Sequence, residues 1–332
     1  MDANLLYVVS ICVVAFLFDF VNGCIDAANS IATVVSTRVL RPIYAVGWAA
    51  LFNFAAAFLF GTHVADTMGK GIVDPGAQSN DLILATLLAA IVWGIITWYL
   101  ALPTSASHAL IGGLAGAALV EAGPESLLVK GLMKVVVFIV LSPVIGLVLG
   151  YASRSIVSLL LWRTSPKSTA RHFRRLQLLS AAAYSLGHGT NDAQKTMGIV
   201  AILLFCNGYL GETFYVPTWV ILTAHGAMAL GTLTGGWRIV KTMGMGITKL
   251  QPVDGFCAEG SAAISLFGTA LAGIPVSTTH TITGAIVGVG STRRLSAVRW
   301  GVTIGVVWAW VLTMPAAALI AAMIRALLQL LR

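Results

Sequence analysis

Long apolar segments recur along the whole chain, and they constrain the fold more than any other feature of the sequence. A helix that crosses a bilayer needs about 20 predominantly apolar residues. Only 10% of the 332 residues are charged, whereas a soluble domain has about 25%. We therefore expect an all-α polytopic membrane protein. The apolar segments cover residues 5–37, 43–61, 82–101, 104–120, 129–152, 176–206, 216–236, 256–273, 276–291 and 301–324.

The segments occur twice in the same order. Each half contains a long segment interrupted by polar residues and glycine, a plain segment, two arms joined at a proline, and a final segment. Asp26 and Asp192 are 166 residues apart, and Pro103 and Pro275 are 172 apart. Such self-similarity indicates an internal duplication. We predict a first transmembrane repeat at 1–161, a basic cytoplasmic linker at 162–175 and a second transmembrane repeat at 176–332.

The loop charges predict the orientation of the two repeats. Lys and Arg concentrate in cytoplasmic loops, so Arg38, Arg41 and the basic stretches 163–175, 238–249 and 293–299 are expected inside. Acid-containing loops are expected outside. The net charge of +8 is then a topology signal and no sign of a nucleic-acid partner. This assignment inverts the second repeat relative to the first and puts both termini outside. Inverted repeats with broken helices are the architecture of secondary transporters.

A few charged residues fall inside the apolar segments. A charge at membrane depth costs roughly 2.5–3.5 kcal/mol on insertion scales, so Asp19, Asp26, Asp192 and Lys195 require an explanation. The segments 22–30 and 187–196 contain Gly23 and the pair Gly187 and Gly189. These glycines predict that both helices are broken there and line a polar cavity. An Asp192–Lys195 ion pair that only fixes packing is the simpler alternative. The matched acid in each half favours a binding site.

The proline-centred junctions predict helix starts. They read Leu-Pro-Thr-Ser-Ala-Ser-His-Ala at 102–109 and Ile-Pro-Val-Ser-Thr-Thr-His-Thr at 274–281. Proline followed by hydroxyl residues is typical of a helix N-terminus. Such a terminus offers free N–H donors and a partial positive charge. Two of them converging from opposite halves would suit a small tetrahedral anion, although capping alone would also explain the hydroxyls.

An anion beside Asp26 and Asp192 needs a compensating positive charge. Lys195, protonation of a carboxylate or histidine, or a bound cation could provide it. The last two would tie anion binding to a co-ion, as in a symporter. The oxygen ligands suit sodium or a hard divalent ion better than zinc.

These motifs, taken in order, resemble those of the inorganic phosphate transporter family, of the bacterial low-affinity type. The family carries a duplicated Gly-x-Asn-Asp-type signature, and the resemblance extends from Phe18-Asp19-Phe20 through the second Pro-Val-Ser-Thr-Thr-His. Lys195, within Asn-Asp-x-Gln-Lys, is similar to a proton-coupled bacterial branch. Ile25 departs from the pattern, since many members have Asn there.

The resemblance implies an inverted-repeat carrier, usually a homodimer. We expect each Pro-centred pair of arms to form a re-entrant helical hairpin, although two full crossings would give the same orientation of the loops. The short loops favour the inner membrane of a prokaryote. The carrier would import inorganic phosphate by proton or sodium symport through alternating access, in some members as a complex with a divalent metal. The implied phosphate ligands are Ser105, Ser107, Ser277, Thr278, Thr279, Asn29, Asn191 and Lys195. The implied coupling-ion or metal ligands are Asp26, Asp192 and Asn22, and the implied proton relay is His108, His280 and Asp19.

Three other functions fit parts of the pattern. A sulfate permease would share the fold, and a passive anion channel would share the anion site. An intramembrane hydrolase could use Ser105 or Ser277 with His and Asp, but these residues occur in duplicate and no nucleophile-elbow motif is present. We therefore expect a transporter that is not an enzyme and needs no resident cofactor.

Overall fold

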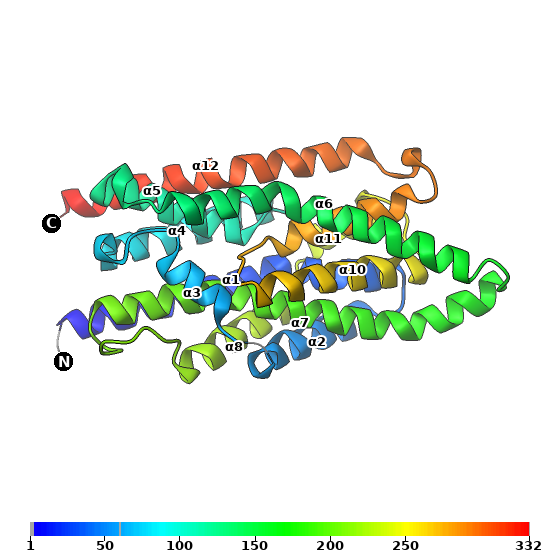
Figure 1. The fold of residues 1–332 in the computed structure, drawn as a ribbon, viewed down its shortest axis with the longest axis horizontal. Helices are drawn as coiled ribbons and strands as arrows, with labels where there is room; N and C mark the ends of the chain where they lie inside the picture. The colour runs from blue at the N-terminus through cyan, green and yellow to red at the C-terminus, as the bar shows by residue number, and fades with distance from the viewer. Residues whose placement is uncertain (1–2, 60, 332) are drawn as a thin grey trace.

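The computed structural model describes residues 3–59 and 61–331 and is an all-α bundle. Its long helices run roughly along one axis, with the two termini at one end and the α6–α7 turn at the other (Figure 1). The helices are α1 (Ala3–Ser36), α2 (Pro42–Ala55), α3 (His63–Lys70), α4 (Asn80–Tyr99), α5 (Ala106–Ala122), α6 (Val129–Leu160), α7 (Pro166–Cys206), α8 (Thr218–Thr234), α9 (Trp237–Lys241), α10 (Pro252–Leu271), α11 (Thr278–Ser291) and α12 (Trp300–Leu330).

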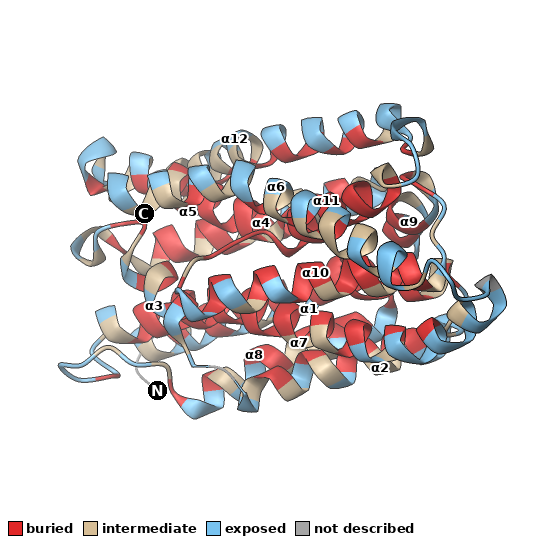
Figure 2. Ribbon diagram, turned by 45° about the vertical axis from the view of Figure 1, so that its right-hand side comes forward, coloured by how far each residue is buried: buried red, intermediate tan, exposed pale blue. Residues whose placement is uncertain are grey.

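Several helices are long and apolar enough to cross a membrane. Within the described ranges they are α1, α4, α6 and α12, and α2 with its 3-10 extension forms a pair with α3 that is bent by 82°. The outer faces of α6 and α12 are largely exposed, whereas the second half of α1, the second half of α7 and most of α10 are buried (Figure 2). The exposed residues of α6 include Val136, Val140 and Val148, side chains that a lipid environment accommodates. The fold is that of an all-α membrane protein.

The predicted breaks in the two long polar helices are wrong. α1 continues through Asn22 and Gly23, and α7 continues from Pro166 to Cys206 and so includes the second signature. The glycines have another use, because a Cβ on Gly189 would lie 2.5 Å from the Asn53 carbonyl oxygen of α2 and one on Gly23 would collide with the Met228 backbone of α8. Glycine at such points lets helix backbones approach closely.

The basic segment predicted as a linker is largely helical. α6 ends at Leu160 and α7 begins at Pro166, so residues 161–165 alone separate the two helices. The side chain of Arg174 reaches across and donates to the Arg38 carbonyl oxygen at 3.0 Å. This contact joins the first part of α7 to the turn after α1 at the end of the bundle opposite the termini (Figure 1).

Two helical hairpins meet inside the bundle. α4–α5 begins beside the start of α1, where the Tyr7 hydroxyl donates to Asp81 at 2.5 Å. α10–α11 enters from the opposite, basic end, where Arg293 pairs with Asp254. The helix starts predicted at the two junctions are confirmed, since the Ser105 and Ser277 hydroxyls each accept the backbone N–H three residues later at 3.2 Å. The two tips touch, because the Ser107 hydroxyl donates to the Val276 carbonyl oxygen at 3.3 Å.

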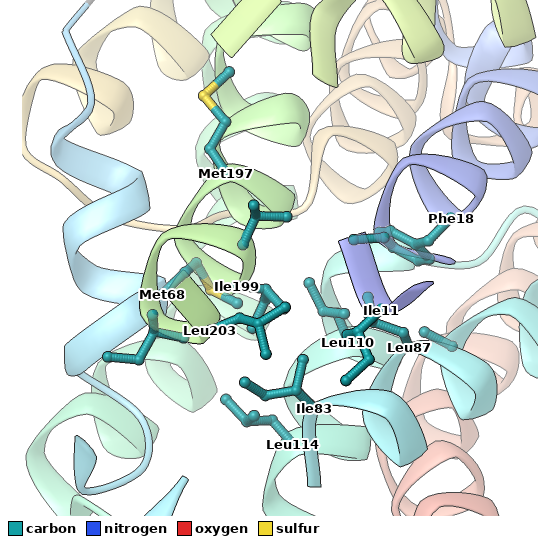
Figure 3. Packing of buried hydrophobic residues seen from close by; sticks show 14 of the residues in the cluster. Ile11, Phe18, Met68, Ile83, Leu87, Leu110, Leu114, Met197, Ile199 and Leu203 are labelled. Atoms are coloured by element: carbon teal, nitrogen blue, oxygen red, sulfur yellow. The ribbon is translucent and has the colours of Figure 1, made fainter. Parts of the chain in front are cut away.

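Apolar packing holds the inner helices on both sides of these tips. Figure 3 shows part of one buried cluster, in which side chains of α1, α3, α4, α5 and α7 interdigitate. A second cluster lies among α1, α2, α7, α10 and α11. The hairpin tips therefore sit between two apolar layers that fix their position.

The second arm of each hairpin carries a Gly-xxx-Gly pair. Gly112 and Gly116 of α5 lie against the α12 backbone, and Gly284 and Gly288 of α11 lie against the α6 backbone. The two pairs are again 172 residues apart. Close backbone contact between helices is a main source of stability in membranes.

Substitution in this contact should destabilise the protein. A Cβ at Gly288 would lie 2.9 Å from the Leu147 carbonyl carbon, whereas one at Gly301 would have no heavy atom within 4 Å apart from its own helix backbone and chain neighbours. We expect Gly288→Leu to cost about 1–3 kcal/mol or more through overpacking, measured as a lower thermal unfolding temperature of the detergent-solubilised protein. Gly301→Leu is the matched control. Equal unfolding temperatures for the two variants would contradict the close-packing argument.

Candidate functional site

A buried polar cluster lies where the two hairpin tips meet α1 and α7. All of its side chains belong to residues that are no more than 4% exposed. None of them faces the outer surface, so the predicted polar residues at membrane depth are gathered in the protein interior, as polar groups in membrane proteins require. The members are Asp26 and Asn29 of α1, Asp192 and Lys195 of α7, Ser107 of α5, and Thr278 and Thr279 of α11.

Lys195 connects three parts of this cluster. Its ammonium donates to the Asp192 Oδ1 atom at 2.6 Å, to the Val276 carbonyl oxygen at 2.8 Å and to the Ser107 hydroxyl. The other Asp192 oxygen accepts the Thr278 hydroxyl at 3.1 Å. The Asp192–Lys195 ion pair considered from the sequence is therefore present, but it also binds both hairpin tips.

The contacts between α1 and the hairpins repeat this pattern. The Asn29 amide donates to the Thr279 hydroxyl at 2.9 Å, and that hydroxyl donates to the Thr104 carbonyl oxygen at 3.1 Å. Lys195 likewise donates to Ser107, which donates to the Val276 carbonyl oxygen at 3.3 Å. Each residue in one chain of contacts lies 166 or 172 residues from its counterpart in the other. The two halves thus exchange equivalent contacts.

Two carboxylates and one imidazole come close enough together to hold a cation. Ligand atoms of Asp26, His188 and Asp192 lie within 4.8 Å of one another. Two buried carboxylates at this separation repel unless they share a proton or a cation. His188 Nε2 lies 3.3 Å from Asp192, and its Nδ1 lies 3.2 Å from the Asn53 side-chain oxygen. This outer contact orients the imidazole, as is usual for metal-binding histidines, and the carboxylate-rich set suits a hard cation.

The structure places other predicted residues in supporting positions. The Ser105 and Ser277 hydroxyls cap α5 and α11. The His108 and His280 rings lie 4.5 Å apart, and His280 stacks on Trp310 at 3.8 Å. Within the described ranges, no hydrogen bond joins this histidine pair to the acidic residues. Both histidines lie in the first turn of their helices, α5 and α11, next to the hairpin tips.

Three further predicted residues lie at the edge of the cluster or outside it. Asp19 accepts the Thr196 hydroxyl at 2.5 Å and is two helical turns, about 10 Å, from Asp26. Asn22 lines a cavity of about 10 Å³ beside the first hairpin tip, which has room for about one water molecule. The Asn191 amide donates to the carbonyl oxygens of Gly187 and Leu266, at 3.0 and 3.1 Å, and so fixes α7 to α10.

Among the buried titratable residues that were not predicted from the sequence, His188 and Glu259 lie in the inner helices α7 and α10. His188 lies four residues before Asp192, a spacing that puts both on one helical face. Glu259 interrupts the apolar arm 256–273, and that interruption was the available signal. Its carboxylate accepts from the Gln177 amide at 2.9 Å and from the Ser180 hydroxyl at 2.5 Å.

Removing the Glu259 carboxylate should destabilise the bundle. Glu259→Ala leaves the Gln177 amide without this acceptor, which costs about 1–3 kcal/mol, and leaves the Ser180 hydroxyl with the Gln177 carbonyl oxygen at 3.2 Å. A clearly lower unfolding temperature is therefore expected. Glu259→Gln retains one acceptor and should lose less. Glu212 is exposed, and Glu212→Ala is the matched control. An unchanged unfolding temperature for Glu259→Ala would show that the Gln177 amide finds another partner.

Comparison with known proteins gives consistent results over nearly the whole chain. The sequence model of the phosphate transporter family matches residues 22–321. A probable low-affinity inorganic phosphate transporter of Rhizobium meliloti is 60% identical over 325 residues, and one of Bacillus subtilis is 45% identical over 324, with 97% of both chains covered in each case. A solved structure, described as the sodium-dependent phosphate transporter, is 26% identical, with a TM-score of 0.90 over 98% of this chain and 100% of that one.

Proposed function

The chain belongs to the phosphate transporter family, and from this premise we propose that it imports inorganic phosphate by cation symport through alternating access. The observation that carries the proposal is the contact of both hairpin tips with one buried cluster of hydroxyls, carboxylates and an ammonium group. The hydroxyls and the ammonium can bind the oxygens of phosphate, and the carboxylates can bind the co-transported cation. The protein is a transporter and not an enzyme.

The hairpin tips supply the groups that bind the anion. The Ser107, Thr278 and Thr279 hydroxyls lie within the first turns of α5 and α11, where free N–H groups and the helix dipole favour an oxyanion. In the present conformation these hydroxyls bond to one another's hairpin and to Asp192. Phosphate would replace those bonds with its own oxygens, so binding and separation of the hairpins are linked.

The acidic residues supply the coupling site. Asp26, His188 and Asp192 would hold a proton or a sodium ion between the two signatures. The bound cation would offset the repulsion between these carboxylates and the anion. A divalent metal that enters as a phosphate complex is a second occupant that the same carboxylates could bind. Sodium is supported by the similarity to a solved transporter that is itself sodium-dependent.

Alternating access would follow from an inverted relationship between the halves. The exchanged contacts of Asn29 and Lys195 support that relationship, as do two hairpins that enter from opposite ends. The basic end, with Arg38 and Arg174, would be cytoplasmic under the positive-inside rule. The hairpins would then be re-entrant, and opening one or the other would expose the fixed site to one side. The homodimer implied by the sequence resemblance stays part of this proposal, and the bacterial origin of the relatives supports the inner membrane of a bacterium.

Competition with sulfate tests the substrate. Phosphate at neutral pH carries P–OH groups that donate hydrogen bonds to carboxylates, whereas the sulfate dianion has no proton to donate. Because the site presents the Asp192 carboxylate, which accepts the Thr278 hydroxyl in the present conformation, as an acceptor, we expect a preference for phosphate of at least about tenfold. Labelled phosphate uptake into proteoliposomes, measured with excess sulfate and with excess unlabelled phosphate, gives this ratio. Equal competition by the two anions would favour the sulfate permease.

A further inference from the structure

We propose that the Lys195 ammonium is a tethered cation that takes the place of one co-transported cation, so that the protein binds one cation fewer with phosphate than its duplicated site could hold. The inference rests on the proposed function and concerns the coupling of the same site. Support comes from the contacts of Lys195, from its counterpart in the first half and from the charges of the two halves.

Lys195 occupies a set of oxygens that a cation would also bind. Its nitrogen has a carboxylate oxygen at 2.6 Å, a carbonyl oxygen at 2.8 Å and a hydroxyl as partners. Carboxylate, carbonyl and hydroxyl oxygens from separate segments form the usual ligand set of hard cations. The Lys195 side chain is 3% exposed, so the ammonium charge is held within the protein and does not reach solvent.

The equivalent position in the first half carries no charge. Asn29 lies 166 residues before Lys195, and its amide contacts Thr279 as Lys195 contacts Ser107. The surrounding contacts are therefore matched in geometry, while the group at the centre is an ammonium in one half and an amide in the other. The duplication provides two similar cation positions, and in the second one the chain fills the position itself.

The charges of the two halves agree with this assignment. Asp192 is compensated by Lys195. For Asp26, by contrast, no lysine, arginine or histidine nitrogen lies within 4.0 Å of the carboxylate among residues 3–59 and 61–331. Of the two carboxylates at the centre of the cluster, Asp26 and Asp192, Asp26 thus lacks a fixed counter-charge within this distance, and one free cation would balance it.

Thermodynamic linkage measures the number of cations directly. The slope of the logarithm of phosphate affinity against the logarithm of ion concentration equals the number of those ions taken up with phosphate. We would measure phosphate affinity of the full-length protein in detergent against sodium, with choline as the replacement ion, and against proton concentration. The two slopes are then summed. The Lys195→Asn variant introduces asparagine, the residue type at the equivalent position, Asn29. It should raise the sum of the two slopes by one relative to wild type.

The reciprocal variant provides an independent test. Asn29→Lys places a second tethered cation beside Asp26, so the summed slope should fall by one. Lys130 is exposed, and Lys130→Asn removes a positive charge far from the cluster and should leave the slope at the wild-type value. Thermal unfolding without phosphate identifies any variant that does not fold, in which case the other variant decides.

The outcomes separate this inference from the proposed function. A wild-type protein that binds no phosphate overturns the proposed function itself. If wild type binds phosphate but the folded Lys195→Asn and Asn29→Lys variants both keep its summed slope, the tethered-cation role is wrong and the proposed function stands. Loss of phosphate binding by folded Lys195→Asn at every sodium and proton concentration also overturns the inference, because a free cation would then be unable to replace the ammonium.

Discussion

Asp192→Asn is expected to abolish phosphate uptake while leaving the protein folded. The substitution keeps the shape of the side chain but removes the only carboxylate that pairs with Lys195 among the described residues. Lys195 then loses its carboxylate partner and the cation site loses one of its two carboxylates. Loss of one partner of a buried charge pair typically weakens binding by about 2–5 kcal/mol, or about 30-fold or more. Labelled uptake into proteoliposomes measures the effect, and size-exclusion chromatography in detergent checks the fold.

A matched surface variant controls for the loss of a negative charge. Asp66 is exposed on α3, and Asp66→Asn should transport at the wild-type rate. If Asp192→Asn also transported at that rate, Asp192 would have no part in the site, and the cluster between the hairpins would be structural.

Asp26→Asn is expected to uncouple transport and not to prevent binding. Among residues 3–59 and 61–331, no lysine, arginine or histidine nitrogen lies within 4.0 Å of the Asp26 carboxylate. The contacts of Lys195 with Asp192, Val276 and Ser107 do not involve it. Phosphate should still bind and exchange across the membrane, but a cation gradient should no longer drive it. We expect the accumulation of phosphate to fall at least about tenfold, with exchange between internal and external phosphate retained.

Two assays on the same proteoliposomes distinguish these results. Gradient-driven uptake measures accumulation, and counterflow with preloaded phosphate measures exchange. Loss of both activities in a folded Asp26→Asn protein would mean that Asp26 binds phosphate itself. Accumulation at the wild-type level would remove Asp26 from the coupling site.

The hairpin tips could be predicted from the sequence because their signals are local. A proline followed by hydroxyl residues marks a helix start wherever it occurs, and Ser105 and Ser277 cap their helices accordingly. The duplication then indicated that the two tips are equivalent. Their direct contact, Ser107 with Val276, joins residues 169 positions apart and could be expected only from the repeat.

The breaks in α1 and α7 were predicted wrongly because glycine has two uses that a sequence does not separate. It relaxes the backbone, but it also admits a neighbouring helix. Gly23 and Gly189 serve the second use, against Met228 and Asn53. Whether a neighbouring backbone fills the space beside a glycine is a property of the tertiary structure.

The missed residues depend on packing in the same way. His188 becomes a candidate ligand only because α1 brings Asp26 within reach of it and of Asp192. Glu259 is tolerated inside the bundle because Gln177 and Ser180 of α7 donate to it. Single residues within one segment indicate polar sites, but the partners that decide their role come from other helices.

Accumulation of labelled phosphate by wild-type proteoliposomes tests the central claim most directly. Uptake would be followed with an inward proton gradient, with an inward sodium gradient, and with neither. We predict that at least one gradient drives internal phosphate above the external concentration and that collapsing this gradient with an ionophore releases the excess. Uptake that only equilibrates phosphate, at the same rate with and without either gradient, would contradict cation-coupled transport and indicate a passive pathway.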